Sequence, residues 1–142
     1  MQFTNILLPV DGSNYSDHAT EYALYLARQC GARITAVSCY EWLGHMPDVN
    51  GSLIEELKDK IARQAAEVLN QTSRILTKAG IEHDTEILSG EPGKMLTSLA
   101  KSKRFDLIVM GSHGHSDIAG LFLGSVTHKV LNKIYCPVLV VP

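Results

Sequence analysis

The 142-residue chain lacks several features that would assign it to a specialised class of protein. Its longest apolar runs are strand-sized and too short to cross a bilayer, so we expect no membrane insertion. Its N-terminus has no basic segment followed by an apolar stretch and a small-residue cleavage site, so we expect no secretory signal. The net charge is −2, without the basic bias of nucleic-acid-binding proteins, and we therefore expect no nucleic-acid partner.

Cysteine and the familiar nucleotide motifs are also scarce. Three cysteines lie far apart and form no CxxC pair, which indicates reduced thiols in the cytoplasm. No GxGxxG follows the first expected strand, and no GxxxxGK[ST] occurs anywhere in the chain. These absences disfavour the usual dinucleotide-binding fold and the P-loop.

Short apolar runs alternate with stretches of helical periodicity along the whole chain. A hydrophobic fraction of 45% and a length of 142 residues fit a single globular domain, residues 1–142. Regular alternation predicts a parallel sheet with helices on both faces. We expect an α/β doubly wound sheet of five parallel strands in the order 3-2-1-4-5. The expected strands are 6–10, 34–40, 81–88, 107–110 and 137–141, and the expected helices are 14–30, 53–79, one beginning near 92, and 124–134.

Helical spacing also predicts which side chains these helices bury. For the long second helix the predicted buried face is Leu53, Leu57, Ile61, Ala65, Val68, Thr72, Ile75, Leu76 and Ala79. For the last helix it is Val126, Val130, Leu131 and Ile134. Residues 41–51, which include Trp42, Leu43 and Met46, are expected to form a loop with a small apolar packing anchor.

In an open parallel sheet, ligands bind beyond the carboxyl ends of the strands. The segment after the fourth strand has Gly111-Ser112-His113-Gly114, nine further residues, and then Gly124-Ser125-Val126-Thr127. Glycines with positive φ turn several amides toward one point, and a helix start adds more, so the pattern is typical of a phosphate cradle. The hydroxyls of Ser112, Ser125 and Thr127 add donors. From the residues alone, a cradle and a purely structural loop remain equally open.

This spacing, Gly111-x2-Gly114-x9-Gly124-Ser125, resembles the nucleotide motif of the ATP-binding universal stress proteins. The opening segment Ile6-Leu7-Leu8-Pro9-Val10-Asp11-Gly12-Ser13 and the closing segment Cys136-Pro137-Val138-Leu139-Val140-Val141 are similar to that family too. The resemblance covers the whole chain.

The resemblance implies ATP, or ADP or AMP, as the ligand, with or without Mg²⁺. Pro9, Val10 and Asp11 would line the adenosine, with Asp11 near the ribose or a cation. The family often has His-Val at the end of its second strand; here Ser38-Cys39 stands there, so Cys39 would contact adenine through its backbone. The segment that would wrap the ribose and phosphates contains Met110, Gly111, Ser112, His113, Gly114, Gly124, Ser125 and Val126.

Three functions follow as alternatives. The first is a cytoplasmic nucleotide-binding module that acts in the stress response. The second is a slow ATPase or an adenylate-transferring enzyme, and the third is an interaction protein whose loop is only structural. The stretch from Gly111 to Val126 contains no lysine or arginine, which favours holding the nucleotide over hydrolysing it. We therefore assign no catalytic residue.

Two further expectations concern metals and assembly. His113, His115 and Asp117 lie close in sequence but form a poor zinc ligand set, so we expect no metal site there. The strand at 137–141 carries no charge and would lie at an edge of the sheet, where unpaired backbone groups favour pairing. The resemblance implies a homodimer through this strand.

Overall fold

Five parallel strands form the centre of the protein, in the order β3-β2-β1-β4-β5. The computed structural model describes residues 1–42 and 50–142, so most of the loop expected at 41–51, including Leu43 and Met46, lies outside the described residues. Both the fold class and the strand order predicted from the sequence are confirmed. The strands are β1 (Asn5–Pro9), β2 (Arg33–Tyr40), β3 (His83–Ser89), β4 (Leu107–Gly111) and β5 (Val138–Val141). The helices are α1 (Asn14–Cys30), α2 (Gly51–Lys78), α3 (Pro92–Lys101) and α4 (Ser125–Leu131).

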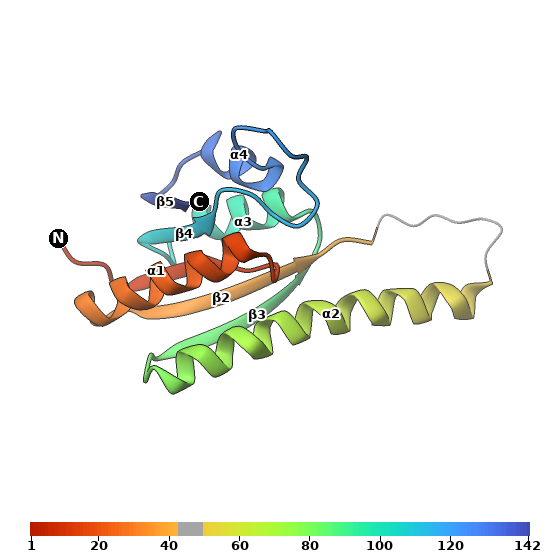
Figure 1. Cartoon of the computed structure of the whole chain (residues 1–142), viewed down its shortest axis with the longest axis horizontal. Helices are drawn as coiled ribbons and strands as arrows, with labels where there is room; N and C mark the ends of the chain where they lie inside the picture. Colours follow the sequence, from red (N-terminus) through yellow and green to blue (C-terminus); the bar gives the residue numbers. More distant parts are fainter. Residues whose placement is uncertain (43–49) are drawn as a thin grey trace.

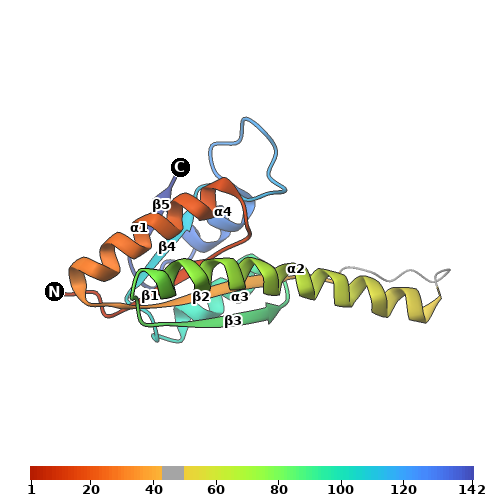
Figure 2. The same ribbon diagram turned by 60° about the horizontal axis from the view of Figure 1, so that its bottom comes forward.

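Helices cover both faces of this sheet (Figures 1 and 2). Each face has its own apolar core. On one face, α1 and α2 pack with side chains such as Ala23 and Leu76 onto Ile6 and Val109. On the other face, α3 and α4 pack with Leu96 and Val130 among the buried residues. Because β4 is enclosed on both sides, all five of its residues are buried, as its unbroken apolar run predicted.

The first helix shows how local sequence sets the boundaries of an element. The Ser13 side chain accepts a hydrogen bond from the Ser16 amide at 3.2 Å and caps the start of α1. Gly31, with φ of 68°, ends the helix in the left-handed region, where glycine is favoured. The turn that follows β1 is thereby held against the first turn of α1.

Two of the predicted helix faces are partly wrong. On α2, which extends well beyond the sheet in Figure 1, Leu53 is 46% and Ile75 is 50% exposed. The periodicity places both residues near the apolar stripe. The sheet does not reach the start of the helix, so Leu53 stays exposed. At the other end Leu76, and not Ile75, packs into the core. The last helix ends at Leu131, before the predicted limit, and Ile134 is 62% exposed.

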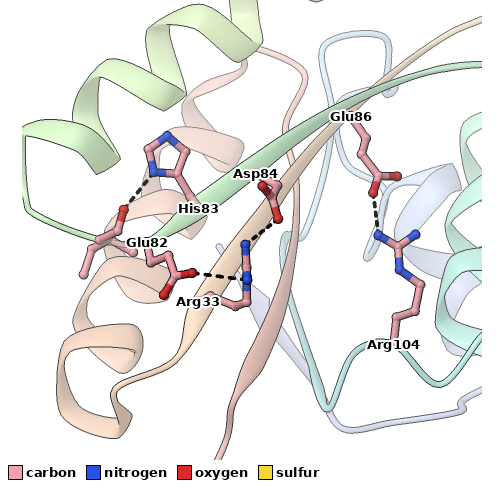
Figure 3. A network of polar contacts seen from close by, with 7 residues as sticks. Arg33, Glu82, His83, Asp84, Glu86 and Arg104 are labelled. Carbon is pink, nitrogen blue, oxygen red and sulfur yellow. Dashed lines mark hydrogen bonds and ion pairs between the residues drawn. The ribbon is translucent and has the colours of Figure 1, made fainter.

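The two edges of the sheet differ in chemistry. Edge strand β3 and its approach are flanked by ion pairs: Arg33 bridges Glu82 and Asp84, and Arg104 pairs with Glu86 (Figure 3). Exposed pairs of this kind stabilise a fold little, but charge at an edge discourages pairing with another chain. The opposite edge, β5, has the sequence Val138-Leu139-Val140-Val141 and carries no charged side chain.

Candidate functional site

The carboxyl ends of β1, β2 and β4 meet at a cavity of about 240 Å³. The loop between β4 and α4 closes one side of it, and the start of α3 contributes Pro92 and Leu96. All of the site residues predicted from the sequence line this cavity except Ser112 and Gly124. The predicted residues that line it are Pro9, Val10, Asp11, Cys39, Met110, Gly111, His113, Gly114, Ser125 and Val126.

Ser112 and Gly124 instead join the two ends of the loop. The Gly124 amide donates to the Ser112 carbonyl at 2.7 Å, and the Ser112 amide donates to the Val141 carbonyl of β5 at 2.7 Å. The loop is therefore closed at its base and anchored to the sheet. These two residues therefore support the loop without lining the cavity.

The glycines of the motif are required by close approach, and the expectation of positive φ at Gly114 is wrong. The described glycines with φ in that region are Gly12, Gly31, Gly80, Gly90 and Gly120. A Cβ on Gly114 would lie 2.7 Å from Asp11 Oδ2, and one on Gly111 would lie 2.7 Å from Tyr15 Cβ. At Gly111 the neighbouring atoms are Tyr15 Cβ and the Tyr15 backbone, which leave no room for a side chain. At Gly114 the neighbour is the end of the Asp11 side chain, which would have to shift.

Two carboxylates hold the backbone of the loop. Asp11 accepts from the Ser13 amide at 2.9 Å and from the His115 amide at 3.1 Å, and so connects the turn after β1 to the loop after β4. Asp117 accepts from the Gly114 amide at 2.5 Å and the Ser125 amide at 3.1 Å, and from Ser125 Oγ at 3.3 Å. Donors of Gly114 and Ser125 therefore converge on the single carboxylate of Asp117.

The hydroxyls expected to serve as donors to a ligand have partners within the protein. Thr127 Oγ1 is buried and donates to the Gly111 carbonyl at 2.8 Å, which fixes α4 against β4. Ser112 Oγ lies 2.9 Å from His113 Nδ1, and His113 Nε2 lies 2.8 Å from the Leu121 carbonyl. A carbonyl only accepts, so the neutral His113 ring carries its proton on Nε2 and accepts from Ser112. The imidazole therefore braces the loop across its width.

The opposite wall of the cavity is apolar and uncharged. Val10, Val37 and Met110 are almost completely buried, and Cys39 stands beside them at the end of β2. Burial raises the pKa of the Cys39 thiol to about 11, so the thiol is neutral at physiological pH. This wall suits a flat, weakly polar group, while the loop presents amides on the other side.

The sequence reasoning missed several lining residues, of which Asp117 is the most informative. An aspartate three residues after a loop glycine is a candidate acceptor for that glycine's amide, which is a local signal that could have been used. Ser16, Val37, Pro92 and Leu96 come from other elements, and only the tertiary structure brings them here. A second, more polar cleft of about 460 Å³ shares His113, Gly114, His115 and Asp117 with the first.

Among residues 1–42 and 50–142, no three side chains of histidine, cysteine, aspartate or glutamate are grouped so that they could hold a metal ion. In the same part of the chain no helix combines the length and apolarity needed to span a membrane.

Comparison with known proteins assigns this architecture to a family. The model of the universal stress protein family matches residues 2–142. The chain belongs to the universal stress protein family. A universal stress protein of Thermus aquaticus is 36% identical to it, with 98% of each chain covered.

Two solved universal stress proteins share the fold described above. One from Lactobacillus plantarum has a TM-score of 0.89 and 28% identity, and the match covers 100% of this chain and 99% of that one. Another, solved in complex with cAMP, has a TM-score of 0.75 and 26% identity, with 100% of this chain and 99% of the other covered. The family resemblance inferred from the glycine spacing is thus confirmed.

Proposed function

We propose that this universal stress protein binds ATP, or the closely related ADP or AMP, in the cavity between β1, β2 and the β4–α4 loop. The observation that carries the proposal is the convergence of the Gly114 and Ser125 donors on a single carboxylate. Backbone and hydroxyl groups that hold a carboxylate in this way are equally suited to a phosphate oxygen.

The shape of the site supports an adenosine moiety in a defined direction. The apolar wall of Val10, Val37, Cys39 and Met110 would face the base, and the predicted contact to adenine is through the backbone of Cys39. Phosphates would extend along the loop toward the polar cleft that shares Gly114. The solved relative in complex with cAMP supports an adenine nucleotide as the ligand class.

The test is to purify the protein without added nucleotide and to identify any bound ligand by mass spectrometry. Calorimetry with ATP, ADP, AMP and GTP on the stripped protein follows. Binding of adenine nucleotides in preference to GTP supports the proposal. Failure of all four to bind a folded protein would refute it.

Within the proposal the protein acts as a nucleotide-dependent binding or signalling module in the stress response, and it acts in the cytoplasm. The three cysteines are free thiols, in keeping with a reducing compartment. The second candidate, a slow ATPase or adenylate-transferring enzyme, would use the same site. It is less well supported, because the loop from Gly111 to Val126 has no lysine or arginine to contact the transferred phosphoryl group.

We therefore expect ATP hydrolysis to be absent or far slower than the roughly 1–100 s⁻¹ of dedicated phosphoryl-transfer enzymes. Release of phosphate should be followed with magnesium and saturating ATP. The variant to compare is Asp11→Ala, since Asp11 lines the cavity and is predicted to lie near the ribose or a cation. Turnover within the stated range that disappears in Asp11→Ala would favour the enzyme over the binding module.

The proposal includes a homodimer formed by pairing of the β5 edges. The Pro137 and Val141 carbonyls accept from the amides of Ile108 in β4 and of Ser112 just after it. Because backbone groups alternate in direction along a strand, those of Val138 and Val140 point to the open edge. Across a two-fold axis, the unpaired backbone groups of this apolar edge would hydrogen-bond to the same strand of a second copy, whereas the β3 edge carries ion pairs.

Val140→Pro is expected to shift the protein from dimer to monomer. It removes an amide donor at the open edge without removing a hydrogen bond to β4, a position where sheets tolerate proline. Light scattering at tens of micromolar measures the change, and Val140→Thr, which keeps the amide, is the control. A wild-type protein that is already monomeric at this concentration would contradict the dimer.

A further inference from the structure

The carboxylate of Asp117 occupies the donors that the proposed function assigns to a phosphate. Its Oδ2 accepts from the Gly114 amide at 2.5 Å, and its Oδ1 accepts from the Ser125 amide at 3.1 Å and the Ser125 hydroxyl at 3.3 Å. Both oxygens are therefore engaged, and they engage residues from the two ends of the glycine motif. Asp117 lies between those ends in sequence, so the anion is supplied by the loop itself.

The space around these donors is also filled by Asp117. A Cβ on Gly124 would collide with Asp117 Oδ2, and a Cβ on Gly114 would lie 3.6 Å from the same oxygen. The space beside Gly124 is thus the space in which the carboxylate of Asp117 lies, and a Cβ on Gly114 would be in van der Waals contact with the same carboxylate. A phosphate oxygen and this carboxylate oxygen cannot occupy that space together, because each needs the same amides and both are anionic.

We propose that Asp117 is an internal competitor for the phosphate-binding amides, and that it determines how strongly the site prefers a nucleotide over a nucleoside. This inference rests on the proposed function. A phosphorylated ligand must displace the carboxylate from Gly114 and Ser125, whereas adenosine can occupy the apolar wall without doing so. Asp117 therefore lowers the affinity for nucleotides and leaves the affinity for the nucleoside unchanged.

Asp117 lies where its side chain can move away from the Gly114 and Ser125 amides. Asp117 is partly exposed, and the residues after it, from Ile118 to Phe122, are exposed. A displaced carboxylate can therefore exchange its amide partners for water at small cost. Among the nearby titratable groups, Asp11 holds the His115 amide, and His113 is braced between Ser112 and Leu121, so neither replaces Asp117 on the donors.

The charge of Asp117 in the structure follows from its contacts. Partial burial opposes ionisation, but the hydrogen bonds from the Ser125 and Gly114 groups outweigh it and hold the pKa of the carboxyl below its ordinary value. Asp117 is consequently a full anion at neutral pH and meets the cradle as a phosphate would.

The decisive experiment compares Asp117→Asn with the wild type by calorimetry, using AMP, ATP and adenosine in the presence of EDTA. Asparagine has nearly the same shape but loses the charge and one acceptor, so it holds the two amides poorly. We expect AMP and ATP to bind Asp117→Asn about tenfold more tightly than wild type, and adenosine to bind within about twofold. Asp17→Asn, on the exposed first turn of α1, removes the same charge and is expected to change nothing.

Each other outcome has a defined meaning. If wild type binds AMP and Asp117→Asn binds it equally or less well, Asp117 braces the cradle and the inference fails while the proposed function stands. If Asp117→Asn weakens ATP binding only when magnesium replaces EDTA, Asp117 is a cation ligand and the inference also fails. If neither AMP nor adenosine binds the wild type, the proposed function fails and the inference fails with it.

A second measurement needs no variant and so does not depend on the folding of Asp117→Asn. The carboxyl carbon resonance of Asp117 is titrated in wild-type protein with and without saturating AMP. We expect a pKa below the ordinary value in the free protein and a return toward that value with AMP, because displacement removes the amide hydrogen bonds. A pKa that stays depressed in the AMP complex would show that Asp117 keeps its donors and would overturn the inference.

Discussion

Gly114→Val is expected to weaken nucleotide binding by at least about a hundredfold, equivalent to roughly 2.7 kcal/mol, while leaving the fold intact. A Cβ at this position would lie 2.7 Å from Asp11 Oδ2 and 3.6 Å from Asp117 Oδ2, and the branches of valine would extend into the cradle between the two carboxylates. Because φ at Gly114 is not positive, valine does not strain the backbone, and the loop lies at the surface. Calorimetry with ATP and AMP measures the loss.

Phe122→Val is the control for this substitution. Phe122 is 92% exposed, belongs to the same loop and lines neither of the two cavities, so valine there leaves both unchanged. Circular dichroism and thermal unfolding establish that both variants are folded. Wild-type affinity in a folded Gly114→Val protein would contradict the assignment of the loop as a phosphate cradle.

Leu76→Ala is expected to lower the free energy of unfolding by about 2–5 kcal/mol. Leu76 is completely buried in the cluster formed by α1, α2 and the sheet, and truncation leaves a cavity that the surrounding strands cannot fill. Equilibrium unfolding in urea, followed by circular dichroism, gives the change from the midpoint and slope.

Ile75→Ala provides the control in the adjacent position of the same helix. Ile75 is 50% exposed, so its truncation is expected to change the free energy of unfolding by less than about 1 kcal/mol. Equal losses in the two variants would mean that α2 is rotated relative to the sheet from the orientation described above, and would restore the broader buried face predicted from periodicity.

The glycine motif indicated the right family, although the conformational reason expected for Gly114 is wrong. Its spacing led to the family, which the comparisons confirm, and most of its residues line the cavity. The expected cause, positive φ at Gly114, is wrong, since the constraint comes from Asp11 and Tyr15 packing against the glycines. Those contacts join residues about a hundred positions apart, so they cannot be predicted from local sequence.

By itself the sequence determined the fold class, the order of the strands and the family. Each of these depends on local propensity or on a spaced motif, and alternation of strand and helix restricts the topology strongly. Only the tertiary structure decided that Ile75 and Ile134 are exposed, that Thr127 donates to the Gly111 carbonyl, and that Asp117 accepts from the Gly114 and Ser125 amides. These outcomes depend on where separate elements meet, and periodicity along one element defines a face without saying how far its partner extends.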